Sequence, residues 1–169
     1  MSIEKEKIYP KATMRNLTHF KSEDYSVPLM LSEFIDNSIA SWEGSKKNED
    51  ISGLEIKITL TKFSQQLNNG NIIDKYSVEI RDNAGGMNES NMRNSAELYD
   101  AGEKGDNDLN QHGIGMKSAC FWLGDDVTIY SKNEFETKMN VLELNSSVRK
   151  DTDELYWDYS SQEFDNSKI

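Results

Sequence analysis

The chain has 169 residues, enough for one domain with a substantial core, and its formal net charge is −11. This acidic balance is the opposite of a surface that neutralises phosphates, so we expect no direct nucleic-acid binding by the chain itself. One cysteine and two histidines exclude an internal disulfide and a zinc cluster of the usual spacing. No signal segment and no membrane-spanning apolar run are present, so we expect a cytoplasmic protein without a membrane partner; nucleoid or nuclear association stays open.

The first periodic segment is a helix expected over residues 26–42. Ser26 is a suitable N-cap, and Pro28 falls in the first turn, where proline is tolerated. Residues 42–48 are expected to form a loop. The next segment predicts a strand buried on one face only, because four apolar residues alternate with polar ones: Leu54, Ile56, Ile58 and Leu60.

The middle of the chain predicts a turn and a second one-sided strand. Asn68-Asn69-Gly70 has turn chemistry, and a strand over residues 76–81 follows it. One-sided strands are typical of an antiparallel sheet with helices on a single face. A polar loop is expected over residues 100–111, long enough for a functional role.

The other elements complete an α+β pattern. They are a helix over 88–99 capped by Asn88, a helix over 114–123, and strands over 126–132 and 137–144. The predicted fold class is therefore α+β, a two-layer sandwich of a mixed, mostly antiparallel sheet with helices on one face. We expect one domain over residues 1–169, with a core over about 25–145 and flanking segments at 1–24 and 146–169. The last 20 residues could add a strand or pack on the surface.

Three segments have residues suited to ligand chemistry, and the first lies on the helix over 26–42. Glu33, Asp36 and Asn37 share one narrow face of this helix. A carboxylate and an amide one turn apart could hold Mg²⁺ and position a water, because hard cations take oxygen ligands. The same stripe could equally be the solvated face of an amphipathic helix.

The second segment, residues 81–87, reads Arg-Asp-Asn-Ala-Gly-Gly-Met and directly follows a predicted strand. Asp82 at the end of that strand could accept a hydrogen bond from an exocyclic amino group. The two glycines would allow the backbone to approach a ligand closely. The alternative is a strand-to-helix turn that uses asparagine and glycine for its geometry.

The third segment, residues 111–119, reads Gln-His-Gly-Ile-Gly-Met-Lys-Ser-Ala. A Gly-x-Gly directly before a helix places backbone N–H groups and the positive end of the helix dipole where an anion could sit. Lys117 could add a charge there, or it could point to solvent. The spacing matches neither a Walker A loop nor the dinucleotide-binding motif.

The order and spacing of the three segments resemble the GHKL ATPases, the superfamily of gyrase B, the ninety-kilodalton heat-shock chaperone, the histidine kinases and MutL. The resemblance runs from about residue 29 to residue 132. The Ile-Gly-Met-Lys-Ser-Ala run is most similar to the Microrchidia and MutL branches. The resemblance implies a Bergerat-type ATP-binding fold with ATP and Mg²⁺ as ligands.

The resemblance also implies roles for individual residues. Glu33 matches the general base for the attacking water, and Asn37 matches the Mg²⁺ ligand. Asp82 matches the residue that binds the adenine amino group, Gly86 the second glycine of its motif, and Met87 an apolar contact to the base. The residues that would line the nucleotide phosphates are Asn110, which stands where the family has a glycine, His112, Gly113, Ile114, Gly115, Met116 and Lys117.

The implied activity is Mg²⁺-dependent binding and slow hydrolysis of ATP to ADP, with closure of a lid over residues 100–111 and nucleotide-dependent homodimerisation. Gyrase B and MutL relatives use a lysine from a following transducer domain, for which 169 residues leave no room. The chain could therefore be a fragment of a longer protein or a minimal member, and a protein partner or a missing transducer domain could complete it.

Three other functions compete with this interpretation. The first is a nucleotide-binding regulatory module that does not turn over without a further domain or partner. A histidine kinase is disfavoured because no dimerisation helix with a phospho-accepting histidine is visible. An acidic interaction domain without enzymatic activity would not need Glu33, Asn37 and Asp82 together.

Overall fold

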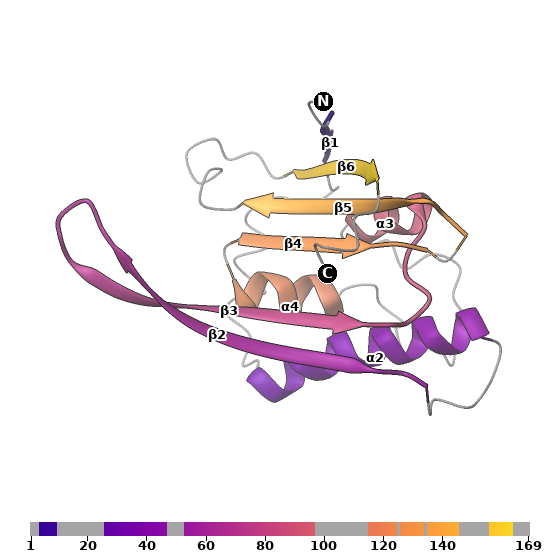
Figure 1. Ribbon diagram of the computed structural model, residues 1–169, viewed down its shortest axis with the longest axis horizontal. Helices are drawn as coiled ribbons and strands as arrows, with labels where there is room; N and C mark the ends of the chain where they lie inside the picture. Colours follow the sequence, from indigo (N-terminus) through magenta and orange to yellow (C-terminus); the bar gives the residue numbers. More distant parts are fainter. Residues whose placement is uncertain are drawn as a thin grey trace.

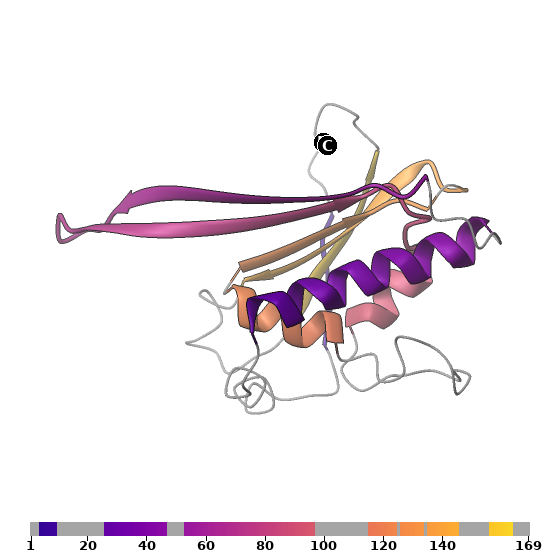
Figure 2. The ribbon, with the colours of Figure 1, turned by 90° about the horizontal axis from the view of Figure 1, so that it is seen from below.

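The computed structural model describes residues 4–9, 26–46, 53–96, 115–124, 126–133, 135–145 and 156–163. The elements within these ranges are, in chain order, β1 (Glu6–Ile8), α2 (Val27–Lys46), β2 (Ile56–Gln66), β3 (Ile72–Asp82), α3 (Glu89–Ala96), α4 (Gly115–Leu123), β4 (Asp126–Ser131), β5 (Lys138–Asn145) and β6 (Trp157–Glu163). The three helices all lie on one side of the strands (Figures 1 and 2). The predicted two-layer α+β sandwich is confirmed.

The described strands form two antiparallel groups. A four-stranded sheet has the order β1-β6-β5-β4, and β2 and β3 form a separate two-stranded hairpin. β1 joins this sheet through β6, with Glu6 opposite Tyr159. Both flanking segments therefore supply a strand of the main sheet, and for the last 20 residues this decides between the two open alternatives, a strand and surface packing.

The apolar core lies between the main sheet and α3. Leu142 and Leu144 alternate along β5, as do Trp157 and Tyr159 along β6, so that all four reach the same cluster. Their counterparts on α3 are Met92 and Ala96, which lie one helical turn apart. Burial of each large side chain contributes about 1.5–3 kcal/mol, so this cluster is the main source of stability for the sheet.

The N-terminal end of α2 agrees with the prediction. The hydroxyl of Ser26 accepts a hydrogen bond from the backbone N–H of Leu29 at 3.4 Å, and its carbonyl accepts one from Met30 at 3.1 Å. Ser26 is thus the N-cap of the helix.

The C-terminal end of α2 does not agree. The helix continues to Lys46, so the loop predicted over residues 42–48 is wrong in its first part. The ring of Trp42 lies against Gly53, where an added Cβ would be 3.1 Å from the ring. We attribute the extra turn to this packing, which offsets the cost of about 1 kcal/mol for Gly44 inside a helix.

The remaining helices and strands follow the predictions closely. Asn88 caps α3, since its side-chain oxygen accepts a hydrogen bond from the N–H of Asn91 at 2.8 Å. α4, β4 and β5 each begin and end within one residue of their predicted limits. The last three residues predicted for α3 and the loop over 100–111 lie outside the described residues. None of the described helices combines the length and the apolarity that crossing a membrane requires.

The hairpin of β2 and β3 is longer than predicted. The two strands pair continuously from Ile56 opposite Asp82 to Gln66 opposite Ile72. Between them, the N–H of Leu67 donates to the carbonyl of Asn71 at 2.8 Å, and Gly70 has a φ of +84°. This tight turn keeps the adjoining polar residues in register, although they show no apolar alternation of their own.

The burial predicted for these strands is wrong over most of their length. Leu60, expected on a buried face, is exposed, and so are its neighbours on that face. The reason is geometric, because the hairpin projects well past the helices that would cover it (Figure 2). We call residues 58–80, the part of the hairpin beyond its first paired residues, the arm.

Candidate functional site

The carboxylate of Asp82, the last residue of β3, is held by donors from two different parts of the chain. Its Oδ2 accepts a hydrogen bond from Ser38 Oγ at 3.1 Å, and its Oδ1 accepts one from the backbone N–H of Ala84 at 3.0 Å. The side chain is nevertheless exposed. Each carboxylate oxygen has a second lone pair, so Asp82 can accept a further hydrogen bond from a ligand in a fixed direction.

The contact with Ser38 fixes where α2 lies relative to the end of β3. Ser38 is buried, and its hydroxyl is also 3.0 Å from the carbonyl of Phe34, so one proton serves two acceptors. Because Ser38 directly follows Asn37, the contact brings the turn of α2 that contains Asn37 beside Asp82, and Glu33 lies on the preceding turn.

Glu33 and Asn37 are both half-buried, whereas Asp36 on the same predicted stripe is exposed. The side-chain nitrogen of Asn37 donates to the backbone carbonyl of Glu33 at 2.7 Å, which fixes the orientation of the amide. The amide oxygen is the kind of ligand that Mg²⁺ takes.

The loop after Asp82 makes a turn that only glycine can adopt. Gly86 has a φ of +66°, a left-handed conformation. A Cβ at this position would lie 2.2 Å from the carbonyl oxygen of Lys132, far inside van der Waals contact. The loop therefore passes so close to the end of β4 that no side chain fits between them. This close approach explains why the second glycine of the predicted motif is needed at position 86.

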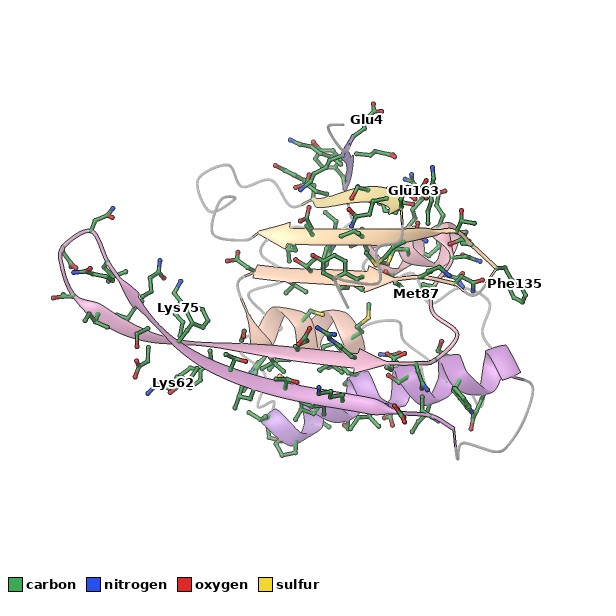
Figure 3. All side chains as sticks on the ribbon, viewed as in Figure 1. Glu4, Lys62, Lys75, Met87, Phe135 and Glu163 are labelled. Carbon is green, nitrogen blue, oxygen red and sulfur yellow. The ribbon has the colours of Figure 1, made fainter. Side chains whose placement is uncertain are left out.

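Met87, the next residue, is held through both of its backbone groups. Its N–H donates to Ser131 Oγ on β4 at 2.7 Å, and its carbonyl accepts from Asn140 Nδ2 on β5 at 3.4 Å. Asn140 is almost fully buried, and its side-chain oxygen accepts a hydrogen bond from the hydroxyl of Tyr159 at 2.8 Å. Figure 3 shows Met87 where the loop passes the ends of these strands. The main sheet thus sets the position of the loop.

The other side of the loop is fastened to the segment just before β2. The side chain of Asn83 accepts from the N–H of Glu55 at 2.8 Å and donates to the carbonyl of Gly53 at 3.0 Å. Asn133 adds a longer contact from the main sheet, since its amide donates to the carbonyl of Gly85 at 3.4 Å. The loop is therefore a rigid element, held by side chains from the main sheet and by the backbone just before the hairpin.

Sequence reasoning missed Ser38, Ser131 and Asn140 as parts of this site. Ser38 and Ser131 give no sequence signal, because serine is common on helices and strands. Asn140 did give one, since alternation places it on the same face of β5 as Leu142 and Leu144. A polar residue on an apolar face needs a buried partner, and that requirement indicates a polar contact.

The third predicted segment is only partly described. α4 begins at Gly115 and packs against α2, and Met116 is half-buried. The backbone of Lys117 lies in the first turn of α4, and its side chain is not among those that the structure describes. Four other predicted site residues lie outside the described residues: Asn110, His112, Gly113 and Ile114.

The described residues contain no group of three or more His, Cys, Asp and Glu side chains that could hold a metal ion. That finding excludes a dedicated protein cage only in this part of the chain. Mg²⁺ commonly keeps several waters and takes one or two protein ligands together with substrate phosphates. The oriented amide of Asn37 fits this mode of binding.

Cys120 on α4 contributes no nucleophile to the site. The side chain is buried, and burial raises the pKa of its thiol to about 12. Only the thiolate is an effective nucleophile, so the thiol is inert at neutral pH.

A comparison with protein families finds a match over most of the chain. The family described as histidine kinase-, DNA gyrase B-, and HSP90-like ATPase matches residues 25–169. The match includes α2, the Asp82 loop, α4 and β6. A comparison with curated proteins finds no match.

Proposed function

Since this chain belongs to the family of histidine kinase-, DNA gyrase B- and HSP90-like ATPases, we propose that it binds ATP with Mg²⁺ and hydrolyses it slowly to ADP and phosphate. The observation that carries the proposal is the carboxylate of Asp82, which is exposed at the end of a strand and yet fixed by Ser38 and by the N–H of Ala84. A fixed acceptor of this kind suits the exocyclic amino group of adenine.

The base would lie between Asp82 and the loop that contains Gly86 and Met87. Because side chains from β4 and β5 hold Met87 by its backbone, its half-buried side chain can offer an apolar contact without reorganisation. Preorganisation of this kind favours affinity, since little conformational freedom is lost on binding.

The phosphates would extend toward the start of α4, where backbone N–H groups and the helix dipole favour negative charge. The residues proposed to line them are Asn110, His112, Gly113, Ile114, Gly115, Met116 and Lys117. The support is the family match together with the packing of α4 on α2.

Asn37 would hold Mg²⁺ through its side-chain oxygen, and the bound cation would offset phosphate charge. Glu33 would act as general base. Its carboxylate would take a proton from a water whose oxygen attacks the γ-phosphorus, while the bond to the bridging oxygen breaks and ADP leaves. Glu33 and Asn37 lie on adjacent turns, so one helix would position both the water and the cation.

The proposal includes three further features supported by resemblance alone. They are a lid over residues 100–111, dimerisation of two copies on ATP binding, and membership of the Microrchidia or MutL branch. Loop closure over a nucleotide would exclude water from the site. A protein partner or a transducer domain would complete the site in that branch.

Binding is tested by calorimetric titration with Mg²⁺-ADP and a non-hydrolysable ATP analogue. We expect saturable binding by the wild type and binding about 10–100-fold weaker for Asp82→Asn, because a hydrogen bond to a charged group contributes about 1.5–3 kcal/mol. Asp74→Asn makes the same substitution on the same strand, within the arm, and should bind like the wild type. Failure of the wild type to bind at millimolar nucleotide would contradict the proposal.

Turnover is tested by phosphate release. Glu33→Ala should keep nucleotide affinity and lose about 10²–10⁴-fold in rate, the usual contribution of a general base. Asp36→Ala removes an exposed carboxylate from the same helix and should leave the rate unchanged. A wild type that binds nucleotide and releases no phosphate would instead be a regulatory module without turnover.

A further inference from the structure

The two faces of the arm differ in chemistry. Residues opposite each other in the hairpin share a face, and the faces alternate along each strand. One face, which we call the apolar face, presents large side chains with exposed fractions between 36% and 70%: Ile58, Leu60, Ile72, Tyr76 and Val78. The other face has Thr59 opposite Glu79 and Thr61 opposite Ser77, and it presents fewer large apolar side chains, Phe63 and Ile73, which are 46% and 36% exposed.

The apolar face continues the face that the hairpin presents to α2. Asp82 lies on it and contacts Ser38 of that helix. Farther along, the arm passes beyond the helices, as Figure 2 shows. Among the described elements, β2 and β3 make extensive contacts only with each other. A two-stranded ribbon is only marginally stable in water unless its apolar face is covered. We therefore expect another surface to cover the arm.

The exposed area matches one side of a homodimer interface. A large apolar side chain presents about 150–250 Å² when fully exposed, so the five side chains leave roughly 400–700 Å² uncovered. That overlaps the upper part of the range for the largest apolar patch of an ordinary monomer, about 300–600 Å². A standard interface buries about 800 Å² per partner, about 65% of it apolar in homodimers. Two apolar faces would therefore cover each other.

Charge favours a contact through the arm over a contact through the rest of the molecule. The chain has a net charge of −11, whereas residues 58–80 have two lysines and two acidic residues and no net charge. On the apolar face, Lys62 and Asp74 form an ion pair at 2.7 Å, which neutralises both. Figure 3 shows Lys62 and Lys75 on the projecting part of the ribbon, away from the helices. Two copies joined by their arms would thus keep their acidic parts apart.

We propose that the apolar face of the arm binds the same face of a second copy of this chain. The two ribbons would stack about 10 Å apart around a two-fold axis, as two sheets do in a sandwich. This dimer goes beyond the proposed function and requires no nucleotide. It is distinct from any dimer that forms on ATP binding.

The test is the molar mass of the full chain in solution without nucleotide, measured by light scattering after size exclusion. The wild type should have twice the 19.3 kDa of one chain. Leu60→Glu should shift the mass to that of one chain and raise the dissociation constant at least about 100-fold, because each dimer would bury two unpaired carboxylates. Thr61→Glu adds the same charge one residue away on the opposite face and should stay dimeric.

A second pair of variants repeats the test on the other strand. Val78→Glu should dissociate the dimer, and Ser77→Glu should not. All four substituted side chains are exposed, so each variant should keep the circular dichroism spectrum of the wild type and, in dilute protein where copies do not associate, its melting behaviour.

Several results would overturn the proposal. A wild type that is a single chain at roughly 100 µM, well above the micromolar constants of weak interfaces of this size, would do so. A dimer that survives both apolar-face substitutions would use another surface. Loss of the dimer in the Thr61 and Ser77 variants as well would remove the assignment to one face. A dimer that forms only with ATP would belong to the proposed function and would also overturn this proposal.

Discussion

The two ends of β3 lie in very different surroundings. At Asp82 the chain enters a loop fixed by side chains from α2, β4 and β5 and by the backbone just before β2, and Gly86 touches the backbone of Lys132. At Ile72, the other end, the strand is exposed to solvent and meets only its hairpin partner among the described elements. The comparison shows how a fold can combine a rigid site with an uncovered surface in one continuous strand.

The difference follows from the number of elements that contact each region. Where the hairpin lies over the helices, each backbone turn has partners from several directions, and a small change must disturb all of them. In the arm, side chains have water on one side, so most changes cost little within one copy. Similar substitutions made in the two regions should therefore change the free energy of unfolding by very different amounts.

The largest separation is expected between two leucines. Leu142→Ala should lower the free energy of unfolding by about 2–5 kcal/mol, because it opens a cavity in the core under α3. Leu60→Ala in the exposed arm should change it by less than about 0.5 kcal/mol. Urea unfolding in dilute protein, where copies do not associate, measures both. Equal losses would mean that the arm is buried within a single copy.

The next comparison uses two glycines with positive φ. Gly70→Ala in the hairpin turn should cost about 1 kcal/mol, since its φ is +84° but no atom lies within 4 Å of the added Cβ. Gly86→Ala should cost at least about 2–3 kcal/mol, because the strain is joined by a contact of 2.2 Å with the backbone of Lys132. It should also weaken nucleotide binding. Similar costs at both sites would show that the loop can move away from β4.

A smaller effect is expected from two serines. Ser131→Ala removes the acceptor for the N–H of Met87 and should cost about 1 kcal/mol of stability, with weaker binding of the ATP analogue. Ser77→Ala, on the face of the arm opposite the apolar face, should alter neither quantity. Ser131→Thr keeps the hydroxyl and should restore binding. A Ser131→Ala variant with unchanged affinity would mean that the clamp on Met87 has no effect on the nucleotide.

The last comparison concerns thiol ionisation. The pKa of Cys120 is raised from 9.0 to about 12 by burial, so the folded chain keeps the proton that the unfolded chain loses. The free energy of unfolding should therefore be unaffected below pH 9 and should fall as pH rises from 9 toward 12, by at most about 1.4 kcal/mol per pH unit. Urea titrations of wild type and Cys120→Ala at pH 8 and pH 10 measure this slope, which the variant should lack.

The same thiol provides a chemical control for the comparison. At pH 8, a thiol reagent should leave Cys120 unmodified in the folded chain and modify it after addition of urea. A cysteine placed in the arm by Leu60→Cys should react at once under the same conditions in dilute protein. Fast reaction of the wild type would show that α4 opens readily.

Local chemistry is the part of the fold that the sequence predicts well. Ser26 and Asn88 cap their helices because short polar side chains satisfy the first free N–H groups, and no distant contact is needed. β1 escaped prediction because three residues show no periodicity and its partner lies far away in the sequence. The exposure of the arm could not be predicted either, because alternation identifies an apolar face and says nothing about what covers it.

For the candidate site the same division holds. The spacing of Glu33, Asp82 and Gly86 indicated a nucleotide site, because these residues match the order and spacing of a family's motifs. The contact between Ser38 and Asp82 joins a helix to a strand 44 residues later, and no local pattern encodes it. The hydrogen bond from Asn140 to Met87 could not be predicted from a local pattern either, because the two residues are 53 positions apart.

The pairing of β1 with β6 has a consequence for synthesis of the chain. Glu6 lies opposite Tyr159, and Arg93 binds the carboxylate of Glu6 at 2.8 Å while its guanidinium stacks 4.2 Å from the ring of Tyr159. A ribosome adds about 5–20 residues per second, so β1 waits roughly 10–30 s for its partner strand. The hairpin, whose contacts are local, can close long before that. The projecting ribbon can therefore begin to close early on the ribosome, although it is marginally stable while uncovered, and the main sheet is completed last.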